Sequence, residues 1–552
     1  MNRNSLISLA LVLLAIMLVS ACAAPTPPPA PPPPAGATVA PTSAPQPTTA
    51  AQPATPKVIR MRITRDPKSL EPGLFSELIT GYIANDMHAQ LLRFDDKNQP
   101  VPYIAKSWQV SSDGLTYTFN LRNDVKFQNG RTVVADDFVY TFTRDLDPRV
   151  KAAIGPTDFS NVKGAKEYIA GTAKTVEGFQ APDATTFKIV LTQPEPAMLM
   201  RLASPFTAVI PKEAVVDGKP QWKDKPIGAG AFRYVDWQTN VKVVLEANPD
   251  YFLGKPKIDR LEYVVVPDAT TAIAQYQKGE LDIIGVSGGQ LAQVNNDPTL
   301  SKELKTFPRA QLTFFVLNEK RVPAFKDKRA RQAFIYAINR QQLIDKVMLG
   351  DRYLATGYVP TGISEAVPDE KAYSYDPAKA QDLMAQAGFP GGKGFPKIEF
   401  VTTSDEGSLA EALTAMLKSN LGIDVTVRIG ESGDVLNGLW ALDKWDIVSW
   451  GWTADYPSAD NWLYQLLYSK LDSNFASYNN PDYDKLVDKA LSEMDSAKRI
   501  ADWQTVEKMA HDEAPMIPFG FAKNLFLVKP YVKGFSAGMM GPNKFENVDI
   551  VK

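Results

Sequence analysis

The single cysteine of this 552-residue chain, Cys22, follows an almost wholly apolar run at the N-terminus. One cysteine allows no disulfide within the chain. Because there are only two histidines, His88 and His511, thiolate zinc sites, iron–sulfur clusters and three-histidine metal sites are excluded. We therefore expect no metal and no other cofactor, and the folded part must be held together by apolar packing and hydrogen bonds.

The length and composition are those of an ordinary globular protein with several domains. At about 150 residues per domain, the chain has room for three to four structural units. Hydrophobic residues make up 44% of it and charged residues 22%, so large buried cores can form. The 62 acidic and 60 basic residues leave a net charge of −2. No nucleic-acid partner is expected, because such a partner needs a basic face.

Residues 1–21 have the layout of a secretory signal peptide. A positive charge precedes the apolar run at residues 6–19, and two small residues follow it. The run is about two thirds as long as a membrane-spanning helix needs to be. Residues 18–22, Leu-Val-Ser-Ala-Cys, resemble a bacterial lipobox, and this resemblance implies cleavage before Cys22 and lipidation of that cysteine. An uncleaved anchor with an incidental cysteine is the alternative.

Residues 22–57 are predicted to form the lipidated start and a disordered linker. From residue 23 to residue 56 the composition is almost entirely Pro, Ala, Thr, Gln and Ser, without a charged residue. Such a segment cannot bury enough apolar surface to offset its ordering entropy. A lipid, a spacer and a folded body together predict an extracytoplasmic protein anchored to the cell membrane.

The rest of the chain mixes both secondary-structure periods. β-Branched or alternating runs at 116–121 and 241–245 predict strands. Apolar residues recur three and four positions apart at 329–347, 377–387 and 482–514, which predicts helices. Strands and helices alternate, so the class is α/β or α+β with several sheets. No linker stands out within the body, which favours interleaved domains.

One enzyme motif occurs in the body. Residues 285–289, Gly-Val-Ser-Gly-Gly, fit the G-x-S-x-G pattern of a serine nucleophile, Ser287, between a strand pattern and a helix pattern. A catalytic triad would need His511, the only histidine further along, yet His511 lies in a pattern typical of a continuous amphipathic helix. A Gly-rich turn at the start of a helix is the alternative, and we prefer it. We expect no enzyme.

A series of short motifs runs through the body in a characteristic order. The motifs lie at residues 102–108, 112–122, 125–130, 135–140 (Ala-Asp-Asp-Phe-Val-Tyr), 226–232, 248–256, 329–340, 375–389 and 450–456 (Trp-Gly-Trp-Thr-Ala-Asp-Tyr). In this order they resemble the extracytoplasmic solute-binding proteins of peptide ABC importers, the oligopeptide- and dipeptide-binding family. Their number and shared order carry the resemblance.

The chain departs from the family pattern at three places. Asn339 and Glu71 each stand where the family has Asp, and residues 457–460 replace a turn that usually contains Asp-Pro. We interpret the first two departures as structural. The third lies beside the expected pocket and leaves the identity of the ligand open.

The resemblance implies an α/β fold with two lobes around a central cleft, a periplasmic-binding-protein-like clamshell, together with a third domain. Lobe I is expected from residues 58–92, 205–318 and 518–552, with a domain inserted at 93–204. Lobe II is expected at 319–517. The implied function is capture of an oligopeptide by closure of the lobes and delivery to a membrane permease driven by ATPases. We expect a monomer.

Peptides of any sequence share a backbone and a terminal amine, which edge strands and an anion can bind. The pocket residues that the resemblance implies are Asp455, Trp450, Gly451, Trp452, Thr453, Tyr456, Ser76, Glu77 and Leu78. Residues 451–453 would form one edge strand, residues 76–78 the facing edge, and Asp455 would receive the ligand's ammonium group. The aromatic residues would wall the pocket, with ordinary core packing as the alternative. No partner is assigned to a ligand carboxylate.

Other ligands stay open within this family. Relatives of the fold also take up dipeptides, nickel complexes, opines or oligosaccharides, and aromatic faces stack on sugars as well as on peptides. The alternative from another class is the serine hydrolase that would use Ser287.

Overall fold

The computed structural model describes residues 55–551, except 75–77, 154, 217–218, 221–225, 368–372, 432, 436–437, 439–443 and 543. These residues belong to one compact unit, Thr55–Lys552. The predicted signal peptide, Cys22 and most of the linker lie outside the described residues, as do Ser76 and Glu77. What the sequence predicts for them stays a prediction. No helix within the described ranges is long and apolar enough to cross a membrane.

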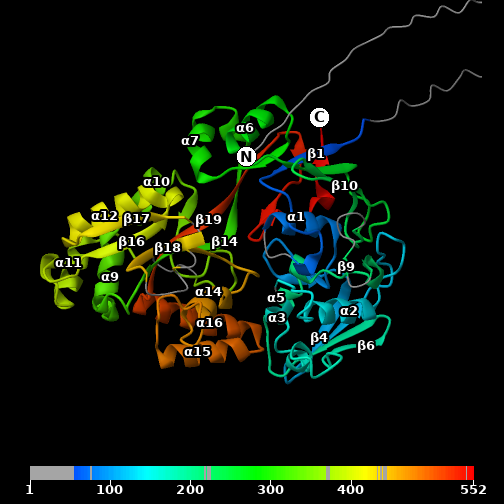
Figure 1. The fold of residues 1–552 in the computed structure, drawn as a ribbon, viewed down its shortest axis with the longest axis horizontal. Coiled ribbons are helices and arrows are strands. Elements are labelled where there is room, and N and C mark those ends of the chain that lie inside the picture. Colours follow the sequence, from blue (N-terminus) through cyan, green and yellow to red (C-terminus); the bar gives the residue numbers. More distant parts are fainter. Residues whose placement is uncertain are drawn as a thin grey trace, which may run out of the picture. The chain divides into compact units, whose positions relative to one another are not determined.

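An eleven-stranded sheet connects distant parts of the chain, in the order β10-β11-β12-β1-β13-β19-β14-β18-β16-β17, with β15 on β19. Its strands are β1 (Val58–Ile63), β10 (Phe232–Gln238), β11 (Lys242–Ala247), β12 (Arg260–Val265), β13 (Ile283–Gly285), β14 (Leu304–Leu317), β15 (Arg352–Leu354), β16 (Ile398–Thr403), β17 (Val425–Gly430), β18 (Ile447–Thr453) and β19 (Met516–Val528). The elements form two groups, one that contains β16, β17 and β18 and one that contains β1 and β10. Figure 1 shows β14 and β19 running between these two groups.

The long strands β14 and β19 pair with each other through most of their lengths. Leu304 pairs with Leu527 at one end, and Val316 pairs with Met516 at the other. The register shifts directly after Pro308, because proline has no amide hydrogen to donate to a ladder. Both groups of elements are therefore built on the same two strands, whose pairing is irregular at two points, after Pro308 and between Thr313 and Phe314.

The helices lie beside this sheet and beside a second, smaller sheet (Figure 1). They are α1 (Leu78–Met87), α2 (Ala135–Asp145), α3 (Gly155–Asp158), α4 (Ala165–Ile169), α5 (Met198–Arg201), α6 (Ala269–Lys278), α7 (Gly288–Asn296), α8 (Leu300–Glu303), α9 (Lys328–Ala337), α10 (Arg340–Lys346), α11 (Pro377–Gln386), α12 (Gly407–Leu421), α14 (Asp460–Leu467), α15 (Pro481–Ser492) and α16 (Ser496–Glu513).

Residues 93–204 carry a separate four-stranded sheet. Its strands, in spatial order, are β4 (Ala105–Val110), β5 (Thr116–Leu121), β7 (Thr186–Val190) and β6 (Phe179–Asp183). Aromatic rings fill the space between this sheet and α2, with Phe142 and Phe159 at 4.6 Å between ring centroids. The same hydrophobic cluster continues to buried residues of β1, β11 and β12, so this part of the chain shares one core with the first strands of the large sheet.

The other end of the large sheet is covered on both faces. Leu312 and Phe314 of β14 point into one cluster with α14, α15 and α16, whereas Phe315 and Leu317 point into another with α9, α11 and α12. This alternation follows from the two-residue period of a strand. Helices on both faces of a partly parallel sheet make an α/β layer, so the predicted α/β class is confirmed.

The structure confirms most of the predicted elements and corrects two of them. Strand β5 has the predicted bounds, and β11 begins one residue later than predicted. The predicted helix 329–347 is two helices, α9 and α10, because the side chain of Asn339 accepts a hydrogen bond from the amide of Gln342 and starts a new helix. The predicted helix 482–514 is also two helices, with Asp495 capping the second.

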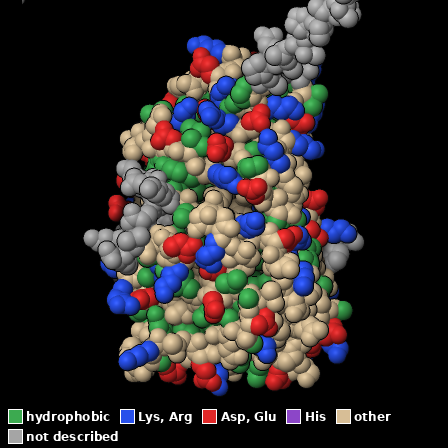
Figure 2. Space-filling view, turned by 90° about the vertical axis from the view of Figure 1, so that its right-hand side faces the viewer, with side chains coloured by type: hydrophobic (Ala, Val, Ile, Leu, Met, Phe, Trp, Pro, Cys, Tyr) green, Lys and Arg blue, Asp and Glu red, His purple; other side chains and the backbone are tan. Residues whose placement is uncertain are grey.

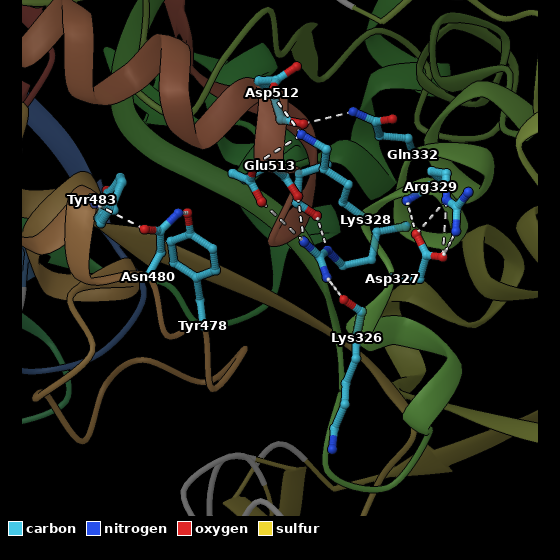
Figure 3. Close-up of polar contacts among 12 residues, drawn as sticks. Lys326, Asp327, Lys328, Arg329, Gln332, Tyr478, Asn480, Tyr483, Asp512 and Glu513 are labelled. Atoms are coloured by element: carbon cyan, nitrogen blue, oxygen red, sulfur yellow. Dashed lines mark hydrogen bonds and ion pairs between the residues drawn. The ribbon is translucent and has the colours of Figure 1, made fainter. Parts of the chain in front are cut away.

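The motif at residues 329–340 has a structural role where α9 meets the end of α16. Figure 3 shows Lys328 beside Asp512 and Glu513, and Arg329 beside Asp327. Arg331 is buried, and its guanidinium donates to backbone carbonyls on both sides of the contact, including Glu513 at 2.7 Å. The last carbonyls of a helix have no hydrogen-bond partner within the helix. Arg331 therefore supplies hydrogen bonds to backbone carbonyls at the C-terminal end of α16.

The surface carries both signs of charge. Figure 2 shows one face on which Lys and Arg side chains are interspersed with Asp and Glu. This face has no patch of a single sign, as the net charge of −2 leads one to expect.

Candidate ligand-binding site

Asp455 lies just beyond the end of β18, where the chain turns toward α14. Its amide donates to the side-chain oxygen of Asn461 at 3.1 Å, which fixes the turn. The side chain of Asp455 is exposed and lines a cavity of about 730 Å³. The other walls come from α1, from the segment after α5 and from the C-terminal residues; they include Tyr82, Asn85, Ser204, Phe206, Met540 and Lys544.

The carboxylate of Asp455 has no hydrogen bond and no ion pair among the described residues. Loss of solvation inside the cavity raises its pKa, and the positive charge of Arg201 acts in the opposite direction. Arg201 is already engaged elsewhere, since its guanidinium lies 2.6 Å from Glu195. The carboxylate of Asp455 therefore faces a cavity and has no ion-pair partner among the described residues, which suits a cationic group of a ligand.

One edge of β18 is open near its C-terminal end. Within the described residues, β16 pairs with β18 only at residues 447–448, while β14 pairs along the whole strand. The amide of Ala454 donates to the carbonyl of Ala310 at 2.9 Å, so every second residue of β18 turns its backbone groups toward β14. Gly451 and Thr453 lie between those positions and turn their N–H and C=O groups toward the open edge.

Arg201 links residues 93–204 to the segment that carries Asp455. Its Nη2 donates to the hydroxyl of Tyr456 at 3.3 Å, and its guanidinium lies over the Tyr456 ring. The hydroxyl of Tyr456 in turn donates to Asp460 at 2.6 Å. Burial lowers the pKa of Arg201, but Tyr456 and Glu195 raise it by more, and the net shift is upward. The guanidinium therefore stays charged.

The contact between Arg201 and Tyr456 stands between two cavities. Arg201 and Asp460 line a second cavity of about 930 Å³, whereas Asp455 lines the first. The second cavity lies between the sheet of residues 93–204 and the helices α14, α15 and α16, and its wall includes Tyr117, Glu195, Glu365 and Trp503. Arg201 thus lines the second cavity and bonds to the segment whose Asp455 lines the first.

The aromatic residues of the predicted pocket pack mostly against protein. Trp450 and Trp452 pair in register with Phe314 and Leu312, and they pack against the same cluster as these core residues. They therefore share the face of β18 that is turned toward α14 and α16. Tyr456 is buried. Of the predicted residues that the structure describes, only Asp455 lines the first cavity.

The remaining predicted residues lie at the margins of the described structure. Gly451 and Thr453 are half-buried on β18, and Leu78 is the first residue of α1. Ser76 and Glu77 precede it and lie outside the described residues. The facing edge strand thus stays a prediction.

Two contributors to the site were not predicted from the sequence. Arg201 lies 255 positions from Tyr456 in the sequence, and no local sequence pattern predicts a contact over such a separation. The C-terminal residues 534–547 that line the first cavity follow the last predicted motif, so resemblance gave no signal there either.

The serine-hydrolase interpretation finds no support in the geometry. Ser287 caps α7, and its hydroxyl hydrogen-bonds to the side chain of Gln290. His511 lies on α16 and stacks on Tyr373 at 4.3 Å between ring centroids. Figure 1 shows α7 near the top of the view and α16 near the bottom, so Ser287 and His511 cannot form a triad. Among the described residues there is also no cluster of His, Cys, Asp and Glu that could hold a metal ion.

The family model "Bacterial extracellular solute-binding proteins, family 5 Middle" matches residues 99–474 of the chain. The match covers more than half of the sequence. This chain belongs to family 5 of the bacterial extracellular solute-binding proteins. A relative in this family, heme-binding protein A of Haemophilus influenzae, is 28% identical over 515 residues, which cover 88% of this chain and 90% of the relative.

Solved structures of family 5 proteins share the two-lobed clamshell fold with this chain. The unliganded open form of the murein tripeptide binding protein MppA matches with a TM-score of 0.80 at 26% identity, covering 90% of this chain and 98% of MppA. OppA of Haemophilus influenzae in complex with the peptide RPPGFSPFR matches with a TM-score of 0.69 at 26% identity, covering 91% and 100%.

Proposed function

We propose that this family 5 protein is the lipid-anchored substrate-binding component of a peptide ABC importer. It would be held to the membrane through Cys22, capture an oligopeptide between its lobes, and deliver the peptide to a permease driven by ATPases. The observation that carries the proposal is the carboxylate of Asp455, which faces the first cavity beside an open strand edge and has no partner among the described residues.

The two features bind what all peptides share. An extended peptide beside Gly451 and Thr453 would add a strand to β18 and pair with the backbone groups at its open edge. Its terminal ammonium group would meet the carboxylate of Asp455 in a charge-assisted hydrogen bond. Neither contact depends on the peptide's side chains, which suits a protein that captures peptides of varied sequence.

Closure of the lobes would complete the site. We assign lobe I to residues 58–92, 205–318 and 518–552, the inserted domain to 93–204, and lobe II to 319–517. Only a few strands cross between the lobes, and β14 is irregular at Pro308, so bending there costs little backbone pairing. Closure would remove water from the cavity and strengthen the Asp455 contact by lowering the local dielectric.

Heme is the ligand named for one relative, and this chain offers little to coordinate it. Haem iron is most often held by a histidine. His88 is fully buried and hydrogen-bonded to the carbonyl of Leu70, and His511 is stacked on Tyr373. Neither histidine lines either of the two cavities described above. A peptide ligand agrees better with the exposed carboxylate and the open edge.

The proposal is tested by combining a ligand variant with a protein variant. Alanine peptides of two to five residues, each with a free or an acetylated N-terminus, are titrated calorimetrically into the wild type, Asp455→Asn and Asp382→Asn. Asp382 is exposed on α11 and serves as the matched control. Removing the charge of Asp455 is expected to weaken binding of the free peptide by about 1.5–3 kcal/mol, the usual value of a charge-assisted hydrogen bond.

The four combinations of wild type, Asp455→Asn, free peptide and acetylated peptide form a double-mutant cycle. A coupling energy well above zero supports contact between the amine and Asp455. A coupling energy near zero removes Asp455 from the amine site. If no peptide binds the wild type, mass spectrometry of small molecules that co-purify with the protein decides between a sugar, a nickel complex and another solute.

A further inference from the structure

Two buried carboxylates, those of Glu365 and Asp460, line the second cavity. Glu365 is 3% exposed and lies between β15 and α11, whereas Asp460 is 4% exposed and begins α14. In the part of the chain that the structure describes, neither carboxylate forms an ion pair. Taking a carboxylate out of water without pairing it costs free energy, so this cavity holds two charges that destabilise the fold.

Each of these carboxylates accepts a hydrogen bond from a neighbouring hydroxyl and has acceptor capacity left. Ser364 donates to Oε2 of Glu365 at 2.6 Å, and Tyr456 donates to Oδ2 of Asp460 at 2.6 Å. Oδ1 of Asp460 is buried and accepts no hydrogen bond from any described residue. Because an ionised carboxylate can accept about four hydrogen bonds, both groups can take a further donor.

The wall of the second cavity carries more negative than positive charge. Four carboxylates and two guanidiniums line it, those of Glu195, Glu365, Asp460, Asp495, Arg201 and Arg499. The guanidinium of Arg201 is paired with Glu195 at 2.6 Å. Burial raises the pKa of Glu365, and the charge of Asp460 acts in the same direction, whereas the charge of Arg499 opposes it. The carboxylates of Glu365 and Asp460 are thus close enough to repel each other.

The remaining wall of this cavity suits an organic cation better than a metal ion. Within the described ranges, no group of three or more His, Cys, Asp and Glu could hold a metal ion. The rings of Tyr464 and Trp503 line the cavity, and aromatic faces attract cations. Leu471, Leu491 and Met494 line it as well and can pack against an aliphatic stem. The volume of about 930 Å³ is in the range of small-molecule sites.

We propose that the second cavity is a separate binding site for an ammonium or guanidinium group on an aliphatic stem, held by the carboxylates of Glu365 and Asp460. Such a cation would neutralise two like charges and donate to the oxygens that have capacity left. The cation can belong to a free diamine or to a basic side chain of a captured peptide, because the amide of Asp455 bonds to Asn461, next to Asp460. This site does not depend on the ligand proposed for the first cavity.

The first part of the test uses 1,5-diaminopentane as the probe and 1,5-pentanediol as its neutral counterpart. Both are titrated calorimetrically into the full chain. The wild type and Asp455→Asn are expected to bind the diamine and not the diol, since Asp455 lines the other cavity. Glu365→Gln and Asp460→Asn should each weaken diamine binding by about ten- to a hundred-fold. Glu411→Gln and Asp382→Asn, which change exposed carboxylates on α12 and α11, should leave it unchanged.

Thermal unfolding without any probe shows whether the variants fold. Glu365→Gln should melt at the temperature of the wild type or above it, because one of two repelling buried charges is removed. Asp460→Asn keeps the shape of the side chain and an oxygen that can accept from the Tyr456 hydroxyl, so it provides a second folded variant. A loss of diamine binding in these folded variants then reports on the site itself.

The second part of the test distinguishes a free amine from a peptide side chain. The tripeptide Ala-Lys-Ala is compared with Ala-norleucine-Ala, which has the same stem without the charge. If the cation comes from the peptide, the wild type prefers the lysine peptide, and Glu365→Gln and Asp460→Asn lose this preference. Failure of both peptides to bind overturns the peptide proposed for the first cavity and leaves this site to the diamine result. A wild type that binds neither the diamine nor the lysine peptide better than its neutral counterpart overturns the site, whatever the variants do.

Diamine affinity and lysine preference that are the same in the wild type and in both folded variants would also overturn it, because the cation would then be held elsewhere.

Discussion

The guanidinium of Arg201 donates to the hydroxyl of Tyr456, which lies 255 positions further along the chain beside the cavity carboxylate Asp455, with 3.3 Å between Nη2 and the oxygen. The same hydroxyl donates to Asp460 at 2.6 Å. One phenol therefore joins two parts of the chain that are far apart in sequence. The other carboxylate oxygen of Asp460 is buried and has no partner among the described residues. The hydrogen bond from the Tyr456 hydroxyl is therefore the one that stabilises this buried carboxylate.

Tyr456→Phe should destabilise the protein and loosen the bridge. The change keeps the ring but removes the hydroxyl, which leaves Asp460 buried without a hydrogen bond. A loss of about 1–3 kcal/mol in the free energy of unfolding is expected, measured by urea denaturation. Tyr464→Phe on α14 is the control, because the Tyr464 hydroxyl makes no hydrogen bond to any residue that the structure describes, and little loss is expected.

The same variant reports on lobe motion. Small-angle scattering should give a larger radius of gyration for unliganded Tyr456→Phe than for the wild type, and a smaller one for the wild type when a peptide is bound. If binding is confirmed by calorimetry and the radius of gyration of the wild type stays constant, the site is rigid and the proposed closure is wrong.

Asp145 should make stability fall as the pH rises from 5 to 8. Burial, together with the charges of Glu71 and Asp158, raises its pKa to about 8, while Arg144 opposes the shift. Between the pKa of the unfolded chain, near 3.9, and this value, the folded state binds more protons, so ionisation favours unfolding. At about 1.4 kcal/mol for each pKa unit, the effect amounts to several kcal/mol.

Asp145→Asn removes this group from the titration. Relative to the wild type, the variant should therefore gain stability between pH 5 and pH 8 in denaturation experiments. Asp147→Asn serves as the control, because hydrogen bonding to Arg149 lowers the pKa of Asp147. Asp147 is therefore ionised in both the folded and the unfolded state between pH 5 and pH 8. An equal pH trend in the Asp145 variant and the wild type would show that Asp145 is solvated in the folded state.

Arg331→Met should be strongly destabilising, although Arg331 lies far from any cavity described above. The guanidinium is 3% exposed and donates to the carbonyls of Phe325 at 2.6 Å and Glu513 at 2.7 Å. Its removal leaves buried acceptors unpaired, and a loss of about 3–5 kcal/mol in the free energy of unfolding is expected. Arg329→Met removes a guanidinium that pairs only with the neighbouring Asp327 (Figure 3) and should cost below about 1 kcal/mol.

Cys22→Ala should abolish the proposed lipidation, because no other thiol exists in the chain to replace it. Detergent-phase partitioning of membrane fractions checks this: the wild type should enter the detergent phase and the variant the aqueous phase. A variant that still partitions as a lipoprotein would contradict the proposed anchor. Peptide binding by the released variant should equal that of the wild type, since the cavity lies wholly within the compact unit.

The sequence predicted those parts of the fold that local pattern determines. Alternation identified β5 with its bounds, and a family motif pointed to Asp455, which the structure places at a cavity. Apolar spacing joined α15 to α16 because the periodicity hardly changes across the break, whereas the cap supplied by Asp495 is a single side-chain contact. Pattern alone could not separate two helices there.

The missed parts of the site depend on contacts between distant residues. Arg201 and Tyr456 lie far apart in the sequence and meet only in the folded chain. Side chains of β18 alternate between its two faces, and this alternation places Trp450 and Trp452 on the same face as core residues of β14. The sequence motif does not show which face is turned toward the core.

Strand β19 has an implication for biosynthesis. It begins at Met516, yet it lies in the middle of the large sheet, between β13 and β14. A ribosome that makes the chain from its N-terminus delivers this strand near the end, so neither half can complete its sheet during most of translation. Non-local pairing of this kind delays folding. The nascent chain would thus stay extended enough to be threaded through an export channel before its last strand closes the structure.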